Sequence, residues 1–232
     1  MTDLADRSVI VVGATGGLGH PIARALAAAG CRLTLVGRDA YRVRASGVAG
    51  LAVGADVRKP ASAPLIVEAA LAEYGGIDGI VYAAGAVAFG AVDETPDEVM
   101  IDLFTLNALA PIRLLRAALP ALRASAEAGR EPFVAHISAV VAEQPQAGMA
   151  AYSASKAALM GYDAAAAREL RREGIRLVDV RPPHTETGLA QRPLAGTAPR
   201  LPQGLEPQQV ADRIVAALRE GEKDVPSSAF TA

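Results

Sequence analysis

The sequence has little of what marks secreted, membrane-spanning or disulfide-stabilised proteins. A single cysteine, Cys31, excludes an intramolecular disulfide and fits a reducing compartment, so we expect a cytoplasmic location. No apolar run reaches the roughly 18–20 residues of a membrane-spanning helix, because Arg, Asp or Glu interrupts each one. Two Asp precede the first short apolar run, where a signal peptide would carry positive charge.

An excess of charge of either sign is also absent. The formal net charge is −2 and the Lys and Arg residues are scattered, which leaves no basic stripe for nucleic acid and no polybasic membrane anchor. The three histidines have no second ligand at metal-binding spacing, so we expect no metal site. The composition, with 51% hydrophobic and 21% charged residues in 232, is that of a folded chain with one buried α/β core.

Short β-branched runs alternate with longer alanine-rich stretches along the chain. The runs with strand character are 8–12, 32–36, 51–55, 79–83, 133–138 and 175–180, with a last one near 223–227. The stretches with helical character are 18–29, 61–74, 97–125, 151–173 and 207–219. Several runs are apolar nearly throughout, as strands buried on both faces of a parallel sheet are. The alternation predicts an α/β fold: a Rossmann-like doubly wound parallel sheet flanked by helices, in a single domain over 1–232.

Three segments depart from this regular alternation. Residues 39–49 are too few for more than one or two helical turns, and Pro111 and Pro120 are expected to kink or divide the helix 97–125. Residues 182–207 hold six prolines and three glycines without helical or strand periodicity. This segment follows the carboxyl end of a strand, where open α/β sheets bind ligands, so we expect a substrate lid over 183–206. The alternative is an ordinary surface loop.

The first strand leads directly into a glycine-rich turn, and a helix follows. Glycines permit a tight turn and let backbone N–H groups approach a pyrophosphate, whose charge the helix N-terminus favours. A glycine-rich turn can also be a plain connection, but its place at the start of a strand–helix series favours a dinucleotide site. The cofactor-binding residues expected here are Gly13, Thr15, Gly16, Gly17, Leu18 and Gly19.

The end of the second strand indicates which dinucleotide is bound. NAD-binding sites usually place a carboxylate there for the ribose 2′-hydroxyl, whereas a 2′-phosphate needs a cation. Gly37 occupies the position where the acid is expected, and the guanidinium of Arg38 follows it. NADP(H) is therefore favoured over NAD(H). An alignment shifted by one residue would bring Asp39 to the acid position and weaken that preference.

Tyr152 and Lys156 lie four residues apart at the start of an alanine-rich helix, so the phenol and the ammonium share one helical face. A free tyrosine has a pKa of about 10 and is a poor acid–base group at pH 7. The ammonium, together with the positive ring of an oxidised nicotinamide, would lower that pKa and let the phenol exchange a proton with an alcohol or carbonyl oxygen. Taken alone, a Tyr and a Lys at this spacing usually mark a solvated helix face. Together with the glycine turn upstream, the pair becomes a specific indication of an active site.

The glycine spacing at 13–19 and the stretch GMAAYSASKAAL at 148–159 resemble the cofactor turn and the active-site segment of the short-chain dehydrogenase/reductase family. The resemblance covers nearly the whole chain. It implies that Asp56 and Val57 contact the adenine, and that Thr187 contacts the nicotinamide amide or a phosphate. It also implies that Tyr152 and Lys156 touch the cofactor as well as the substrate.

Two further parts of the site are implied by the resemblance. Ala84 and Gly85 match a strand end that contacts the cofactor through its backbone, although Tyr82 and Ala83 replace two asparagines of the family's motif. Asn107 matches a helix asparagine that holds a water in the proton relay to the lysine.

The family's catalytic serine falls by resemblance on Ala139, one residue after Ser138. Neighbouring strand residues point to opposite faces, so a slip of one residue would turn the hydroxyl away. In one account the loop 142–148 holds an extra residue and Ser138 takes the catalytic position. In the other, Ser138 is structural and Tyr152 holds the substrate oxygen with an unidentified group. We favour Ser138 as the fourth catalytic residue.

These features predict an NADP(H)-dependent oxidoreductase that reduces a ketone or aldehyde, or oxidises the matching alcohol, by hydride transfer with Tyr152 and Lys156 as the acid–base pair. Its partner would be a small carbonyl or alcohol, with neither nucleic acid nor membrane. The resemblance implies a homodimer or homotetramer formed through the helices 97–125 and 151–173. The alternative, which Ala139 and the replaced asparagines keep open, is a cofactor-binding sensor or partner-binding protein with little turnover.

Overall fold

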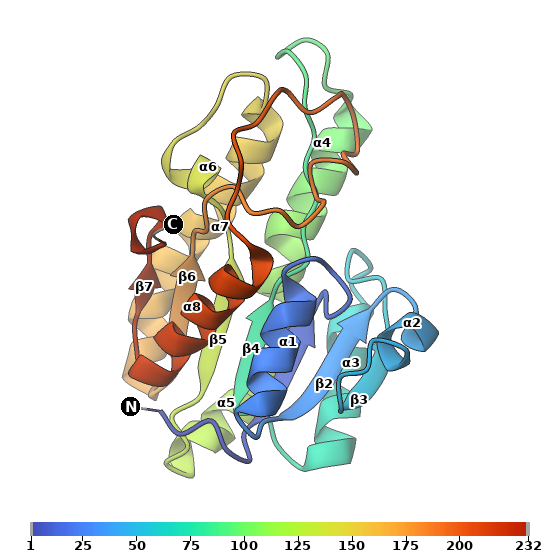
Figure 1. Ribbon diagram of the computed structural model, residues 1–232. Coiled ribbons are helices and arrows are strands. Elements are labelled where there is room, and N and C mark those ends of the chain that lie inside the picture. The colour runs from blue at the N-terminus through green and yellow to red at the C-terminus, as the bar shows by residue number, and fades with distance from the viewer. Residues whose placement is uncertain (1, 231–232) are drawn as a thin grey trace.

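One parallel sheet forms the centre of the molecule, and helices cover both of its faces (Figure 1). The computed structural model describes residues 2–230; residues 1 and 231–232 of the predicted domain lie outside the described residues. The sheet has seven strands in the order β3-β2-β1-β4-β5-β6-β7. Their bounds are β1 Ser8–Val12, β2 Arg32–Gly37, β3 Leu51–Gly54, β4 Gly79–Tyr82, β5 Phe133–Ile137, β6 Arg176–Val180 and β7 Asp224–Val225. The predicted fold class is confirmed.

The strand order reverses between β1 and β4. From β1 the chain adds β2 and β3 on one side, and then returns to place β4 to β7 on the other. Val9 of β1 pairs with Leu33 on one side and with Gly79 on the other. Connections leave the sheet in opposite directions at such a switch point, and ligands of open α/β sheets bind in the crevice that this leaves at the carboxyl ends of the strands.

The helices sort into two layers that follow from their apolar faces. Helices α1 (Gly19–Ala28) and α8 (Pro207–Glu220) bury one face of the sheet, and both lie in front of it in Figure 1. Helices α3 (Ser62–Tyr74), α5 (Ala110–Glu127) and α7 (Ala150–Leu170) bury the other. The strands between them are apolar on both sides because both sides are covered.

The predicted helix 97–125 is divided before Pro111, as expected, but not at Pro120. Helix α4 (Asp97–Phe104) passes into one π-helical turn, η1 (Thr105–Leu109), before α5 begins. Pro111 has no N–H, so it cannot donate to Asn107 in α-helical register or to Leu106 in π-helical register. The Tyr82 hydroxyl donates to the Leu106 carbonyl instead, at 3.0 Å. Pro120 stays inside α5.

The remaining segments are short. Helix α2 (Ala40–Arg44) lies within 39–49, where at most one or two helical turns were expected, and α7 ends in a 3₁₀ turn, η2 (Arg171–Glu173). The sequence did not predict α6 (Val140–Glu143) or the 3₁₀ turn η3 (Ser227–Ala229). Residues 183–206, which we call the lid segment, contain no helix or strand and cross the top of the molecule in Figure 1. None of the helices described is long and apolar enough to cross a membrane.

Candidate active site

The glycine turn after β1 packs closely against two other segments. Gly13 has a φ of +81°, and the N–H groups of Gly13 and Ala14 both donate to the Val36 carbonyl. A Cβ on Gly13 would lie 2.9 Å from the Ala84 nitrogen, and a Cβ on Gly17 would clash with the backbone of Thr187. The turn therefore tolerates no side chain at these positions. Gly13 packs against the residues that follow β4, and Gly17 packs against the start of the lid segment.

Arg38 and Asp39, which follow β2, differ in their hydrogen bonding. The Asp39 carboxylate accepts hydrogen bonds from the backbone N–H groups of Tyr41 at 2.8 Å and Arg42 at 3.4 Å, and so caps helix α2. Arg38 is exposed and its guanidinium makes no hydrogen bond or ion pair within residues 2–230. A Cβ on Gly37 would come within 2.7 Å of Val43, with Thr15 of the glycine turn beside it.

Asp56, at the end of β3, is already engaged by a neighbouring arginine. Its two carboxylate oxygens accept from Arg58 at 3.1 and 2.9 Å, and hydrogen bonding by Arg58 holds the pKa of Asp56 below its usual value. Arg58 also reaches Asp102 of α4 at 3.3 Å. The expected contact of Asp56 with an adenine would have to share this carboxylate with Arg58, while Val57 is half-buried beside it.

Tyr152 and Lys156 are both buried in the first turns of α7, with 8% and 5% of their surfaces exposed. The Lys156 ammonium donates to the Ile137 carbonyl at 2.8 Å. Burial lowers the pKa of Lys156 to about 8, against an opposing effect of the nearby Asp179 charge.

Burial also raises the pKa of Tyr152 to about 12, opposite to the lowering expected from the sequence. The reason is that burial removes the phenolate from water, which disfavours the charged form. The lowering of the Tyr152 pKa that the sequence predicts would therefore need a further positive charge at the site, such as that of an oxidised nicotinamide.

Asn107 lies in the π-helical turn and is 1% exposed. Its amide exchanges hydrogen bonds of 3.0 and 2.9 Å with the backbone of Ala86 and donates to the Ser155 hydroxyl at 2.9 Å. A Cβ on Gly85 would lie 3.2 Å from the Asn107 Oδ1 and 3.4 Å from the Lys156 Nζ. The structure thus brings the two predicted site residues together beside Gly85, at the end of β4.

Ser138 does not face the position expected of it. Its hydroxyl donates to Asp179 Oδ1 at 2.5 Å, with the Val180 carbonyl at 3.3 Å, so it is turned toward β6. Ala139 instead lies in the apolar cluster that surrounds Tyr152. The extra residue suspected in 142–148 does not bring Ser138 to the substrate side, because the chain turns into α6 at Val140 directly after Ala139.

Tyr152 belongs to a cluster of buried apolar side chains. We call this set the tyrosine cluster: Ala86, Val87, Ala88, Phe89, Leu103, Ala139, Val141 and Tyr152. Four residues of the lid segment pack against it: Leu189, Ala190, Ala195 and Ala198. The lid segment therefore packs against the cluster that holds Tyr152, and its Thr187 also lies against Gly17 of the glycine turn.

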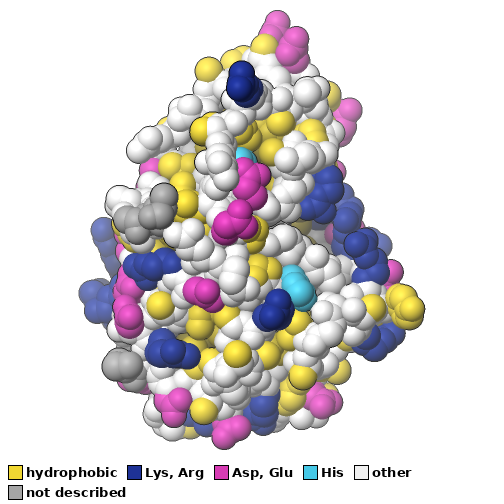
Figure 2. Space-filling view, viewed as in Figure 1, with side chains coloured by type: hydrophobic (Ala, Val, Ile, Leu, Met, Phe, Trp, Pro, Cys, Tyr) yellow, Lys and Arg dark blue, Asp and Glu magenta, His cyan; other side chains and the backbone are white. Residues whose placement is uncertain are grey.

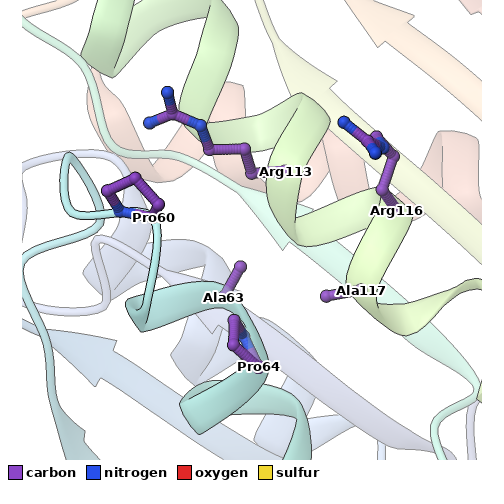
Figure 3. Close-up of a pocket in the computed structure, with 6 residues that line it drawn as sticks. All are labelled: Pro60, Ala63, Pro64, Arg113, Arg116 and Ala117. Carbon is purple, nitrogen blue, oxygen red and sulfur yellow. The ribbon is translucent and has the colours of Figure 1, made fainter.

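An open pocket of about 420 Å³ lies elsewhere, between α3 and α5. Figure 3 shows Arg113 and Arg116 extending from α5 above Pro60, Ala63 and Pro64. None of the predicted site residues lines this pocket. The chemistry expected at Tyr152 is therefore separate from it.

Comparison with known proteins gives one consistent result. A model of the short chain dehydrogenase family matches residues 7–196. Ipsdienol dehydrogenase of Ips pini is 29% identical over 201 residues, which cover 83% of this chain and 79% of that protein. A short-chain dehydrogenase of Streptomyces avermitilis superposes with a TM-score of 0.83 at 29% identity, over 97% of this chain and 90% of that chain. For the 3-ketoacyl-(acyl-carrier-protein) reductase of Brucella melitensis, solved with NADH, the TM-score is 0.85 at 25% identity, over 98% and 100%.

Sequence reasoning missed three residues that shape this site. Tyr82 donates a hydrogen bond to the π-helical turn, and Arg58 binds the carboxylate of Asp56. Asp179 accepts a hydrogen bond from the Ser138 hydroxyl. A signal existed for Tyr82, since Pro111 leaves a carbonyl without its helical donor. Asp179 was also visible, as a carboxylate between two valines of β6.

Proposed function

Because the chain belongs to the short-chain dehydrogenase/reductase family, we propose that it reduces a ketone or aldehyde, or oxidises the matching alcohol, with NADP(H) as the hydride carrier. The observation that carries this proposal is the convergence of Lys156 Nζ and Asn107 Oδ1 beside Gly85. The residues that follow β4 also pack against Gly13 of the glycine turn. The acid–base pair and the nucleotide turn would therefore lie at the same edge of the sheet.

The residues present fit a dinucleotide. Side chains are excluded at Gly13 and Gly17, so backbone N–H groups are what the turn offers to a pyrophosphate at the start of α1. Thr187 lies against Gly17 and would meet the nicotinamide amide or a phosphate. Ala84 and Gly85 would line the ribose side, next to Lys156.

NADP(H) is favoured by the different engagement of Arg38 and Asp39. The Asp39 carboxylate is used to cap α2, which leaves it poorly placed for a ribose 2′-hydroxyl. The exposed Arg38 guanidinium is available to a 2′-phosphate, which it can bind through two parallel N–H donors.

The proton would move through side chains of this chain. The bound nicotinamide supplies the hydride for reduction and accepts it in oxidation. In the reductive direction Tyr152 gives its hydroxyl proton to the substrate oxygen and becomes a phenolate. Lys156, whose pKa is about 8, returns a proton to the phenolate at neutral pH. Asn107 would hold a water in the proton relay to Lys156, the role that the family resemblance implies for it.

Substitution of Tyr152 by Phe tests the proposal, since it removes only the hydroxyl. NADP(H) should still bind, and reduction of a carbonyl substrate should fall by at least about 100-fold, the usual contribution of a general acid. Tyr162→Phe on the same helix is the matched control and should leave the rate unchanged. Unchanged turnover in Tyr152→Phe would refute the assignment.

A second candidate is a cofactor-binding sensor with little turnover. The observation that favours it is the combination of Ala139 in the tyrosine cluster and a Ser138 hydroxyl engaged by Asp179. Binding of NADP(H) without turnover over a broad panel of carbonyls and alcohols would favour this candidate.

A further inference from the structure

The ammonium of Lys156 is buried without a carboxylate beside it. Its Nζ donates to the Ile137 carbonyl at 2.8 Å, and it forms no ion pair in the part of the chain that the structure describes. A buried cation loses its proton readily, because it has left the water that stabilised its charged form. Negative charge close to this site therefore bears on whether Lys156 stays protonated.

Asp179 comes close to this ammonium at the end of β5. The carbonyl of Ile137 holds Lys156, and the N–H of the same peptide unit, on Ser138, donates to the Val180 carbonyl of β6 at 2.9 Å. The Ser138 hydroxyl then donates to Asp179 Oδ1 at 2.5 Å. The ammonium and the carboxylate thus bind two adjacent residues of one strand.

Two short hydrogen bonds favour the carboxylate form of Asp179. Ser138 donates to one oxygen, and Arg181 Nη1 donates to the other at 2.6 Å. Burial raises the pKa of Asp179, and these two donors oppose that effect. Arg181 also binds Glu143 of α6 and Asp224 of β7. One guanidinium therefore faces three carboxylates and does not neutralise them.

A histidine–carboxylate pair and two tyrosines are the other titratable groups that face this region. His136 lies opposite Asp179 in the sheet, and its Nδ1 is 2.8 Å from Oδ1 of Asp163 on α7. Burial raises the pKa of Tyr82 on β4 and of Tyr152 on α7, so both hydroxyls are uncharged at neutral pH.

Burial makes the charge of Asp179 effective. Charged side chains project into solvent across the face shown in Figure 2, where water and salt screen them. Asp179, Lys156 and Arg181 are 7%, 5% and 8% exposed, so little water is available to screen their charges. Burial lowers the pKa of Lys156 to about 8, and the charge of Asp179 opposes that lowering.

From this arrangement we propose that Asp179 is a positioning residue of the active site, a buried carboxylate whose charge keeps the Lys156 ammonium protonated for the reaction. The inference rests on the proposed function, in that Lys156 is taken to return a proton to Tyr152. Asp179 acts through Lys156, because Ser138 and Arg181 occupy its own two oxygens.

Titration of Lys156 by NMR tests this inference without turnover. The chain has three lysines, of which Lys59 and Lys223 are exposed, so ¹³C-lysine labelling gives one buried signal among three. Asp179→Asn removes the charge at nearly constant volume and should lower the titration midpoint of Lys156 by about one pH unit, with or without NADP⁺. Asp179→Ser, which leaves room for a water beside Arg181, is a second variant with the same expected shift.

Two controls separate the charge from the hydrogen bonds. Asp224→Asn removes the same charge from another side of Arg181, but the Asp224 side chain is 59% exposed. Water screens that charge, so the Lys156 midpoint should shift far less. Ser138→Ala removes a donor and keeps the charge of Asp179, so the midpoint should stay nearly unchanged.

The rate of reduction should follow the same change. Loss of a nearby negative charge favours loss of a proton, so the alkaline limb of the kcat profile of Asp179→Asn should move about one unit to lower pH. On that limb kcat should be about tenfold below that of the parent. The substrate is the carbonyl that the parent reduces fastest with NADPH. A merely structural role of Asp179 would lower kcat without moving the limb.

The outcomes distinguish this inference from the proposed function. A Lys156 midpoint that stays in place in both Asp179 variants would overturn the inference, whatever the activity. A midpoint that moves while the alkaline limb does not would overturn the role of Asp179 in the reaction. A midpoint that moves in a protein that reduces no carbonyl would support the link between the two groups and contradict the proposed function.

Discussion

The Tyr82 hydroxyl donates a 3.0 Å hydrogen bond to the main-chain carbonyl of Leu106, one residue before the buried Asn107. In π-helical register that carbonyl would accept from residue 111, which is a proline without an N–H. Tyr82 therefore supplies from β4 the donor that the helix lacks. Tyr82 is itself about 1% exposed, and burial raises its pKa, so it stays a protonated donor. The residue that departs from the family's asparagine thus stabilises the turn that carries Asn107.

Tyr82→Phe should remove this support while preserving the ring. The Leu106 carbonyl would lose a buried donor, which typically costs about 1–3 kcal/mol, so the free energy of unfolding should fall by that amount. We expect kcat to fall more than KM changes, because the role proposed for Asn107 is in proton transfer. Urea unfolding and steady-state rates provide the measurement. Tyr41→Phe, at an exposed tyrosine, is the control, and equal behaviour of the two variants would contradict the role given to Tyr82.

Ala139→Ser should restore a hydroxyl within the tyrosine cluster. If the added hydroxyl donates to the substrate oxygen, kcat should rise about tenfold, a modest part of what such donors contribute. Ser138→Ala should leave kcat nearly unchanged and lower stability, because Asp179 loses a buried donor. The reverse pattern, with activity lost in Ser138→Ala, would reinstate Ser138 as the catalytic serine.

Lys156→Met should change how stability depends on pH. Burial lowers the pKa of Lys156 from 10.5 to about 8, so the folded protein binds its proton less well than the unfolded chain. The resulting cost is full below pH 8 and disappears as the pH rises through 10.5. Methionine avoids this cost, which corresponds to roughly 3 kcal/mol, but forfeits about 1 kcal/mol from the bond to the Ile137 carbonyl.

The variant should therefore be more stable than the parent at pH 7, and the gap should close between pH 8 and 10.5. Denaturant titrations at a series of pH values measure it, and Lys59→Met, at an exposed lysine, should leave the profile unchanged. A gap that is absent at pH 7 or that grows with pH would show that Lys156 is not a desolvated cation.

Arg38→Gln should shift cofactor preference. Loss of a guanidinium that binds the 2′-phosphate should weaken NADPH binding by about 10- to 100-fold and leave NADH binding nearly unchanged. Fluorescence titration of both nucleotides measures the two affinities. Arg44→Gln, on the last turn of α2, is the control. Parallel loss for both nucleotides would argue against a 2′-phosphate at Arg38.

The strands and long helices could be predicted because their signals are local. β-branched runs such as Ser8–Val12 are apolar throughout, and the observed bounds lie within about two residues of those expected at most ends. The break before Pro111 was also readable, since a missing N–H is a property of one residue. Helix α6 was not, because four residues give no helical period, and its position depends on contacts between Glu143, Arg181 and Ser227.

The direction of side chains was harder to predict than their places. Lys156 and Asn107 come together beside Gly85, and Tyr152 lies one turn before Lys156 on the same helix. Ser138 turns to Asp179 because a buried carboxylate on the neighbouring strand needs a donor, and strand pairing is a long-range property. The pKa of Tyr152 depends on total burial in the folded state, which spacing along a helix does not contain.

The structure of the protein bound to NADP⁺ tests the central claim most directly. We predict the pyrophosphate against the backbone of residues 13–19, the 2′-phosphate at Arg38, and the nicotinamide within van der Waals reach of the Tyr152 hydroxyl and Lys156. A nicotinamide bound elsewhere, or a Tyr152 hydroxyl buried away from it, would contradict the assignment of this helix turn as the acid–base site.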